Sequence, residues 1–86
     1  MFRIEFLEEA KEEFAKLDRT IQKLIKEKLE VLSKNPSNLK NNIKPLKGEY
    51  SKLFRLRVAN YRIIYLQEKN KLLITIVRIG HRKEIY

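Results

Sequence analysis

Positively charged side chains recur at alternate positions in one short part of this chain. Arg55 and Arg57 are separated by a single leucine, and Arg62 follows five residues later. A guanidinium group donates two parallel hydrogen bonds to phosphate oxygens, so this residue type suits a phosphate backbone. The chain also places its single histidine, His81, and an aromatic, Tyr86, near its C-terminal end. An imidazole can exchange protons near neutral pH, and an aromatic ring can stack on an exposed base.

The positive charge is concentrated in the second half of the sequence. The formal net charge is +9, but residues 1–40 hold nine Lys/Arg against eight Asp/Glu, whereas residues 41–86 hold eleven against three. A surplus that served solubility alone would be scattered, so the asymmetry predicts an anionic partner for the second half. RNA fits the arginines best, and an acidic protein is the alternative.

Composition excludes several classes of protein. The chain has no cysteine, so it has neither a disulfide framework nor a thiolate metal site. Its apolar runs are far shorter than the roughly 18–20 residues that span a bilayer. Acidic residues from Glu5 onward do not fit a signal peptide. We expect one cytoplasmic domain, residues 1–86, that does not contact a membrane.

Hydrophobic periodicity predicts the elements that must position these residues. Residues 2–6 alternate as a short strand, and from Glu8 the apolar period becomes helical. Asp18 is placed to cap a second helix, which ends before Pro36. We interpret residues 35–51 as a long connecting loop, followed by strands at about 52–58, 61–67 and 72–79. The expected fold is α+β, in the order β-α-α-β-β-β, with a helical hairpin on one face of a small antiparallel sheet.

The predicted hairpin brings the arginines together. If Ala59-Asn60 forms a two-residue turn, Arg57 lies opposite Arg62, and Arg55 lies opposite Ile64. All of these side chains then share the face away from the helices. Like charges in opposite positions destabilise a sheet unless an anion binds between them. Arginines on an exposed strand can also serve solubility and edge protection. The same alternation places several members of a further set on this face, which makes it partly apolar and would equally suit a partner protein: Ile64, Leu66, Leu73, Thr75 and Val77.

Three segments together resemble the RelE toxins of toxin–antitoxin systems. They are Leu46-Lys47-Gly48, the hairpin from Phe54 to Tyr65 with its R-x-R-x-x-x-Y-R-I-I-Y pattern, and the C-terminal H-R-x-x-x-Y of residues 81–86. The N-terminal strand, the helical hairpin and the Asn-Pro loop fit as well, so the resemblance covers nearly the whole chain.

The resemblance implies a ribosome-dependent endoribonuclease that cuts messenger RNA in the ribosomal A site without a metal or other cofactor. In this reaction the substrate's 2′-OH attacks the adjacent phosphate and leaves a 2′,3′-cyclic phosphate and a 5′-OH. It also implies a cognate antitoxin and the ribosome with mRNA as partners. Operator DNA, contacted through the antitoxin, is a further candidate ligand of the toxin–antitoxin complex.

The family's catalytic positions fall on Arg55, Arg62, Arg82 and Tyr86. By this resemblance Arg62 clamps the phosphate, Arg82 stabilises charge and assists the leaving group, and Tyr86 stacks on or orients the scissile nucleotide. The RNA-binding residues are expected to be Lys47, Lys52 and Arg57.

The resemblance departs from the family at the proton acceptor. Well-studied members carry two lysines on the first hairpin strand, whereas this chain has Leu53 and Arg55 there. Arginine stays protonated in proteins, so Arg55 is a better phosphate ligand than a base. His81 is then the best candidate acid–base group, and Lys52 is the weaker one.

Two alternatives remain at this point. A ParE-like inhibitor of gyrase shares the fold but acts by binding a protein, and such members generally lack the set of Arg62, Arg82 and Tyr86. A catalytically weakened member that binds only RNA or antitoxin would fit the departures at Leu53 and Arg55.

Overall fold

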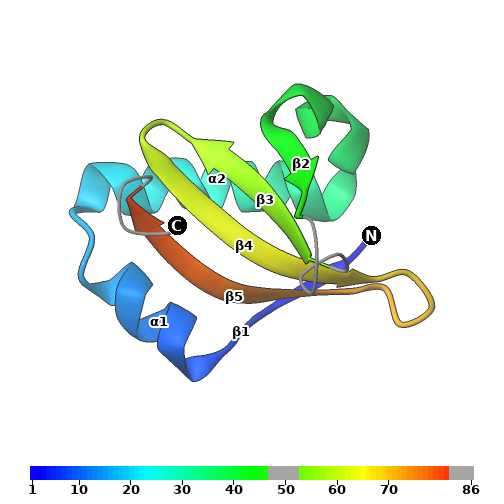
Figure 1. Ribbon diagram of the computed structural model, residues 1–86, viewed down its shortest axis with the longest axis horizontal. Helices are drawn as coiled ribbons and strands as arrows, with labels where there is room; N and C mark the ends of the chain where they lie inside the picture. The colour runs from blue at the N-terminus through cyan, green and yellow to red at the C-terminus, as the bar shows by residue number, and fades with distance from the viewer. Residues whose placement is uncertain (47–52, 82–86) are drawn as a thin grey trace.

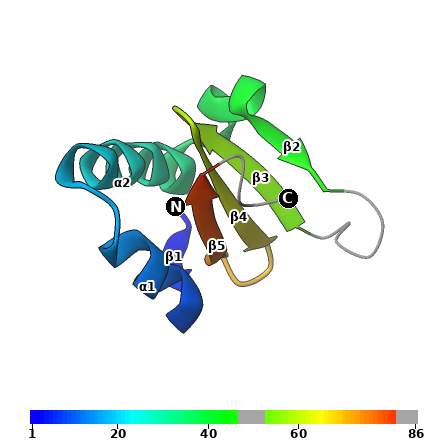
Figure 2. The ribbon, with the colours of Figure 1, turned by 60° about the vertical axis from the view of Figure 1, so that its left-hand side comes forward.

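A five-stranded mixed sheet with two helices on one of its faces runs through residues 1–46 and 53–81, the part of the chain described by this computed structural model (Figure 1). The elements follow in the order β1 (Arg3–Phe6), α1 (Glu8–Ala15), α2 (Arg19–Lys34), the short 3-10 helix η1 (Pro36–Asn42), β2 (Ile43–Pro45), β3 (Leu53–Val58), β4 (Tyr61–Glu68) and β5 (Leu73–His81). Figure 2 shows both α-helices on the same side of the sheet. The predicted α+β class and the helical hairpin on one face are confirmed.

The two helices begin and end where the sequence indicates. Glu8 and Glu9 lie in the first turn of α1, where the helix dipole favours negative charge. Asp18 caps α2, because its carboxylate accepts a hydrogen bond of 2.9 Å from the backbone N–H of Ile21. A cap of this kind stabilises a helix by about 1 kcal/mol. Asn35, the residue before the proline, closes α2 with its N–H bonded to the carbonyl of Val31.

The hydrophobic core lies between the helices and the sheet. Burial of one aliphatic side chain contributes about 1.5–3 kcal/mol, and alternate apolar residues of β3, β4 and β5 are buried here. The buried members of this cluster are Ala10, Ile25, Leu29, Leu32, Leu39, Leu56, Val58, Ile63, Tyr65, Ile74, Ile76 and Ile79.

Strand order in the sheet is β1-β5-β4-β3-β2. The pairs β2–β3, β3–β4 and β4–β5 are antiparallel, as expected, but β1 pairs with β5 in parallel, with Arg3 opposite Leu73. The helical hairpin crosses one face of the sheet and carries the chain from β1 at one edge to β2 at the opposite edge. The sheet is therefore mixed rather than purely antiparallel.

We interpreted residues 35–51 as a long loop, and the described part of that segment, residues 35–46, is more regular than predicted. It contains η1 and the edge strand β2, whose Ile43 lies opposite Leu56 of β3. Leu39 of η1 is buried in the core. Pro45 lacks a backbone N–H, and such a residue is tolerated at a sheet edge like this one.

The turn between β3 and β4 confirms the predicted register. Val58 pairs with Tyr61, so Ala59 and Asn60 form the two-residue turn. Ala59 has a φ of 54°, which is the left-handed region that glycine prefers.

A β-bulge in β5 changes which side chains are buried. Ile64 pairs with Arg78 while the next residue, Tyr65, pairs with Ile76, so Val77 is the extra residue. Strict alternation after Ile76 would turn Arg78 toward the core. The extra residue moves Ile79 there instead, where it is 2% exposed.

Candidate functional site

Two pairs of cationic residues lie directly across from each other on the face of the sheet away from the helices. Arg57 of β3 pairs with Arg62 of β4, and Lys44 of β2 pairs with Arg55 of β3. Opposite side chains share a face, with their Cβ atoms about 4.5–5.5 Å apart. Neither β2 nor β3 contains an acidic residue. This arrangement, called the cationic face below, consists of Lys44, Arg55, Arg57 and Arg62.

Arg62 has a buried side-chain donor on the cationic face. Its Nε is buried, and no other group in the described part of the chain accepts its hydrogen bond. A buried donor without a partner costs about 1–3 kcal/mol, so such groups usually have a ligand. On its other side Arg62 pairs with Gly80, whose lack of a side chain leaves room beside the guanidinium. An anion with several oxygens would satisfy this nitrogen.

Apolar residues continue the same face beyond the arginines. Ile64 is 5% exposed and lies opposite Arg55, yet it is not part of the core under the helices. Leu66 lies between Leu53 and Thr75 on its two neighbouring strands. The expectation that the face is partly apolar is therefore confirmed by the strand register.

Arg78 does not join the cationic face, although it pairs with Ile64. It makes ion pairs with two acidic residues of α1: 3.1 Å to Glu9 and 2.9 Å to Glu13. The hydrogen bond that the Arg78 guanidinium donates to the Glu13 carboxylate is the main cause of the raised pKa of Arg78. The other oxygen of Glu13 accepts a hydrogen bond of 2.7 Å from the backbone N–H of Ile79. Glu13 thus accepts the hydrogen bond of a backbone N–H in β5 that lies beyond the last residue paired with β1.

His81 ends β5 beside an aromatic ring. It pairs with Tyr61, and the two rings meet edge to face with centroids 5.6 Å apart. Because Gly80 lies opposite Arg62, alternation along β5 places His81 on the other side of the sheet from Arg62. Of the predicted catalytic residues, the structure brings Arg55 and Arg62 onto one face and places His81 at the end of the sheet.

Four of the predicted site residues lie outside the described residues. These are the catalytic candidates Arg82 and Tyr86 and the RNA-binding candidates Lys47 and Lys52. Their roles stay predictions.

Lys44 is a member of the cationic face that we did not predict from the sequence. Its position depends on β2, which we interpreted as loop. The signal that could have revealed it is the alternation of Ile43, Lys44 and Pro45, because a short apolar–polar–apolar run with a proline fits an edge strand.

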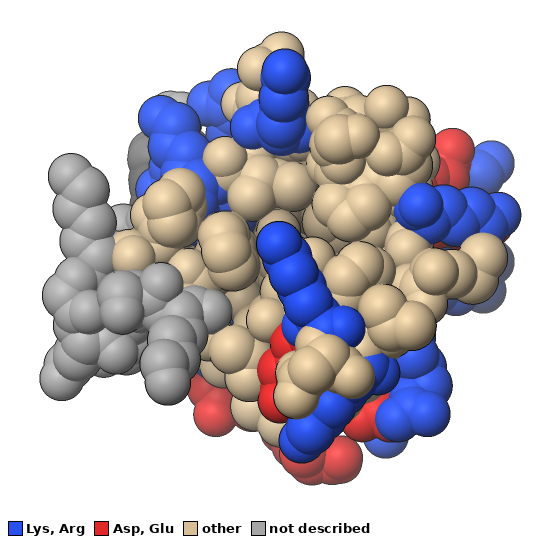
Figure 3. All heavy atoms as spheres, turned by 90° about the vertical axis from the view of Figure 1, so that its right-hand side faces the viewer, with Lys and Arg blue, Asp and Glu red and all other residues tan. Residues whose placement is uncertain are grey.

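Positive charge is not confined to the cationic face. Figure 3 shows the end of the molecule with the β4–β5 turn, where Lys and Arg side chains lie around an area of uncharged residues. The cross-strand pairing, rather than the overall charge, therefore distinguishes the cationic face.

Within residues 1–46 and 53–81, no three His, Asp or Glu side chains are grouped so that they could hold a metal ion. No helix in the same residues is long and apolar enough to cross a bilayer.

Comparison with known proteins identifies the family. Residues 4–86 match the family described as the ParE toxin of the type II toxin–antitoxin system parDE. A protein of Escherichia coli named as a RelE-like toxin is 29% identical over 82 residues, which cover 95% of this chain and 84% of that protein.

Solved structures agree with this result. The RelB–RelE antitoxin–toxin complex from Methanococcus jannaschii contains a chain that is 30% identical, with a TM-score of 0.75, over 95% of this chain and 94% of that one. The RelBE2 toxin–antitoxin complex from Mycobacterium tuberculosis gives 26% identity and a TM-score of 0.77, over 94% of this chain and 98% of that one. The chain therefore belongs to the RelE/ParE family of toxins from type II toxin–antitoxin systems.

Proposed function

We propose that this toxin is a ribosome-dependent endoribonuclease that cleaves mRNA in the A site, and that Arg62 binds the scissile phosphate. The observation that carries the proposal is the buried Nε of Arg62, which has no partner among the described residues and lies on a strand directly opposite Arg57. Two guanidinium groups held in this way repel each other until an anion binds between them. A phosphodiester has the charge and the oxygens to do so.

The proposed reaction needs no metal ion. The 2′-oxygen of the RNA forms a bond to the adjacent phosphorus, and the bond from phosphorus to the 5′-oxygen breaks. A base takes the proton of the 2′-OH, and an acid gives a proton to the leaving 5′-oxygen, so the products are a 2′,3′-cyclic phosphate and a 5′-OH. Arg62 and Arg55 would stabilise the charge on the non-bridging oxygens as it builds up.

The remaining roles are proposed from the family resemblance. Arg82 would assist the leaving group, and Tyr86 would stack on the scissile nucleotide. Arg57, Lys47 and Lys52 would bind the flanking RNA backbone. Lys44 joins them because it lies opposite Arg55. His81 is the candidate for proton transfer.

The proposed partners are the ribosome with its mRNA and a cognate antitoxin, which places the activity in the cytoplasm. The antitoxin is supported by the relatives from M. jannaschii and M. tuberculosis, which were crystallised as toxin–antitoxin complexes. The toxin–antitoxin complex would contact operator DNA through the antitoxin.

Inhibition of gyrase is the second candidate, because the matching family is named for ParE. It is tested together with the first. The chain is induced in cells, transcript 5′ ends are mapped, and DNA damage is measured. Ribonuclease activity predicts new 5′ ends within translated codons. Growth arrest with intact transcripts and broken DNA would instead support the gyrase function, and the absence of both effects would leave a binding module.

Two variants make this experiment specific. Arg62→Ala should lose cleavage by about 100-fold or more, the usual loss when one charge-stabilising donor of a transition state is removed. The matched control is Arg19→Ala, since Arg19 is exposed at the start of α2, away from the cationic face. Equal loss of cleavage in both variants, or full cleavage by Arg62→Ala, would contradict the proposed role of Arg62.

A further inference from the structure

Gly80 lies within β5, directly opposite Arg62 of β4. Glycine weakens a strand, because it has more freedom to lose on folding and no side chain to pack. Where a strand contains one, it often marks a bulge or a place where a ligand or another backbone approaches closely. The bulge of β5 is at Val77, three residues earlier, and the pairs on both sides of Gly80 keep a regular register. A bulge therefore does not explain this glycine.

Close approach of another helix or strand does not explain it either, within the described part of the chain. Gly80 shares the cationic face with Arg62, whereas both α-helices lie on the other face (Figure 2). β1 pairs with β5 only as far as Ile76. At this end of β5, α1 makes its contact at the edge of the sheet, where Glu13 accepts the N–H of Ile79. Close approach of a ligand remains as the reason for Gly80.

The pattern of backbone hydrogen bonds shows how the neighbours of Arg62 differ on its two sides. Ile79 directs its N–H to Glu13 and away from β4, so its own pair with β4 is not hydrogen-bonded. The next pair, Gly80 with Arg62, is then the hydrogen-bonded one. The pair of Arg62 with Arg57 on the other side is consequently non-hydrogen-bonded, the kind in which Cα atoms are about 4.5 Å apart and side chains lie closer. Arg62 thus has a second guanidinium close by on β3 and no side chain opposite it on β5.

The buried Nε of Arg62 distinguishes between two ways in which a guanidinium binds phosphate. Binding end-on, through the two terminal nitrogens, would leave Nε without an acceptor, since no described group accepts its hydrogen bond. A buried donor without a partner is unfavourable. Binding side-on, through Nε and one terminal nitrogen, satisfies it. Arg62 as a whole is only half-buried, so part of the side chain still reaches the surface.

We propose that Gly80 is a positioning residue whose missing side chain lets a phosphate of the RNA bind side-on to Arg62. Two non-bridging oxygens accept hydrogen bonds from Nε and from one terminal nitrogen of the guanidinium. One of these oxygens takes the place beside Arg62 that a Cβ at residue 80 would fill. Arg57 lies close enough to add its positive charge. This inference rests on the proposed role of Arg62 as the phosphate ligand, and it adds the residue that controls access to that ligand.

The test is a titration of the folded protein with inorganic phosphate, followed by the NMR chemical shift of the Arg62 Nε–H. Burial slows the exchange of this proton with water, so its resonance can be followed. We expect a saturable change in wild type and at least tenfold weaker binding in Gly80→Ala. Gly80→Val should bind more weakly still, because its side chain is larger, although valine is favoured in strands. Wild-type affinity in either variant, or no change of this resonance in wild type, would overturn the proposal.

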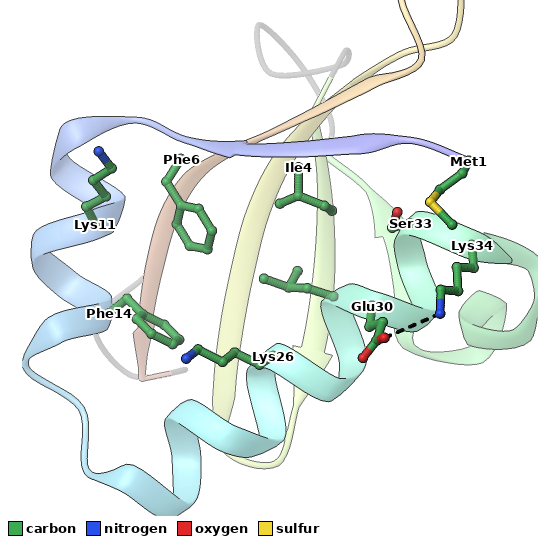
Figure 4. Close-up of a pocket in the computed structure, with 10 residues that line it drawn as sticks. Met1, Ile4, Phe6, Lys11, Phe14, Lys26, Glu30, Ser33 and Lys34 are labelled. Carbon is green, nitrogen blue, oxygen red and sulfur yellow. Dashed lines mark hydrogen bonds and ion pairs between the residues drawn. The ribbon is translucent and has the colours of Figure 1, made fainter.

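Two control variants test whether the effect is local. Val77→Ile adds one carbon to β5 at a position about 10 Å along the strand from Gly80. Lys26→Gln removes a cation from the groove between β1, α1 and α2, which lies on the helix side of the sheet (Figure 4). Both variants should bind phosphate at Arg62 with wild-type affinity. A loss in either control equal to that in Gly80→Ala would indicate a general effect and count against the proposal.

The pairing of β4 with β5 is checked in the same variants. Hydrogen exchange at the backbone amides of Arg62 and Gly80 should be as slow in wild type as at residues 62 and 80 of Gly80→Ala and Gly80→Val, since these amides join the two strands. Retained protection with weaker phosphate binding supports the proposal. Loss of this protection in both variants would show that the glycine serves the pairing of the strands, and would overturn it.

Mapping of transcript 5′ ends separates this inference from the proposed function. Induction of Gly80→Ala in cells should give at least tenfold fewer new 5′ ends than wild type, whereas Val77→Ile should give as many. Full cleavage by Gly80→Ala would overturn the role of Gly80 and leave the ribonuclease function intact. If wild type cleaves no RNA but still binds phosphate at least tenfold more tightly than Gly80→Ala, the proposed function fails and the role of Gly80 at the anion site stands.

Discussion

Arg57 and Arg62 lie directly opposite each other on neighbouring strands, with a two-residue turn between their strands. This pair opposes folding, since like charges in opposite positions destabilise a sheet by up to about 1 kcal/mol. A chain selected for stability alone has no reason to keep it. An anionic ligand bound between the two arginines would offset their repulsion, and the proposed function supplies such a ligand in the RNA phosphate.

The first prediction concerns this pair. Arg57→Gln should raise the free energy of unfolding by a few tenths of a kcal/mol at low salt, because the repulsion with Arg62 is removed. The gain should shrink at high salt, where exposed charges are screened. Urea unfolding at both salt concentrations measures it. Arg19→Gln is the control, and a gain of the same size in that variant would show that net charge rather than the pair is responsible.

The second prediction concerns proton transfer. If His81 transfers a proton, His81→Ala should slow single-turnover cleavage of ribosome-bound mRNA. Its position beside Tyr61, on the other side of the sheet from Arg62, predicts a smaller loss than that of Arg62→Ala. An unchanged single-turnover rate in His81→Ala would remove this residue from the mechanism.

Much of the fold could be predicted from local patterns. Alternation located the strand at β1, helical periodicity located α1 and α2, and the Ala59-Asn60 turn fixed the register that sets Arg57 opposite Arg62. These features depend on residues close together in the sequence. Once the position of the turn is known, it determines which residues of the two hairpin strands lie opposite each other.

The remaining features depend on contacts between distant residues. The parallel pairing of β1 with β5 joins residues about seventy positions apart, and nothing within Arg3–Phe6 specifies that partner. The bulge at Val77 could have been suspected, because Ile76 and Ile79 break strict alternation. Lys44 was missed for a related reason, since a three-residue edge strand is defined mainly by the strand it pairs with.

The third prediction concerns the edge of β5. Glu13→Gln should lower the free energy of unfolding by about 1–2 kcal/mol, since Glu13 accepts a charge-assisted hydrogen bond from Ile79 and pairs with Arg78. Glu9→Gln should have a much smaller effect, because Glu9 is largely exposed and pairs with Arg78 alone among the described groups. Hydrogen exchange at the Ile79 amide separates the two, and equal protection in both variants would contradict this role of Glu13.

The fourth prediction concerns the turn between β3 and β4. Ala59→Gly should raise the free energy of unfolding by up to about 1 kcal/mol, because the φ of 54° is unfavourable for a residue with a Cβ. The gain is reduced by the greater freedom of glycine in the unfolded chain. Chemical denaturation measures the change. The control is Ala15→Gly in the last turn of α1, which should destabilise, and destabilisation at both sites would rule out a strained turn.

The fifth prediction concerns alkaline pH. Tyr65 is 1% exposed and stacks on Phe54, and burial raises its pKa to about 12 from the ordinary value of 10.0. The folded state therefore keeps its proton where the unfolded chain loses it. The contribution is fully present below about pH 10 and is lost as the pH rises toward 12, at about 1.4 kcal/mol per pH unit. Urea unfolding of wild type and Tyr65→Phe at pH 9 and pH 11 isolates this group. The wild type should lose more stability than the variant over that interval, and equal losses would mean that Tyr65 ionises as readily in the folded state as in the unfolded one.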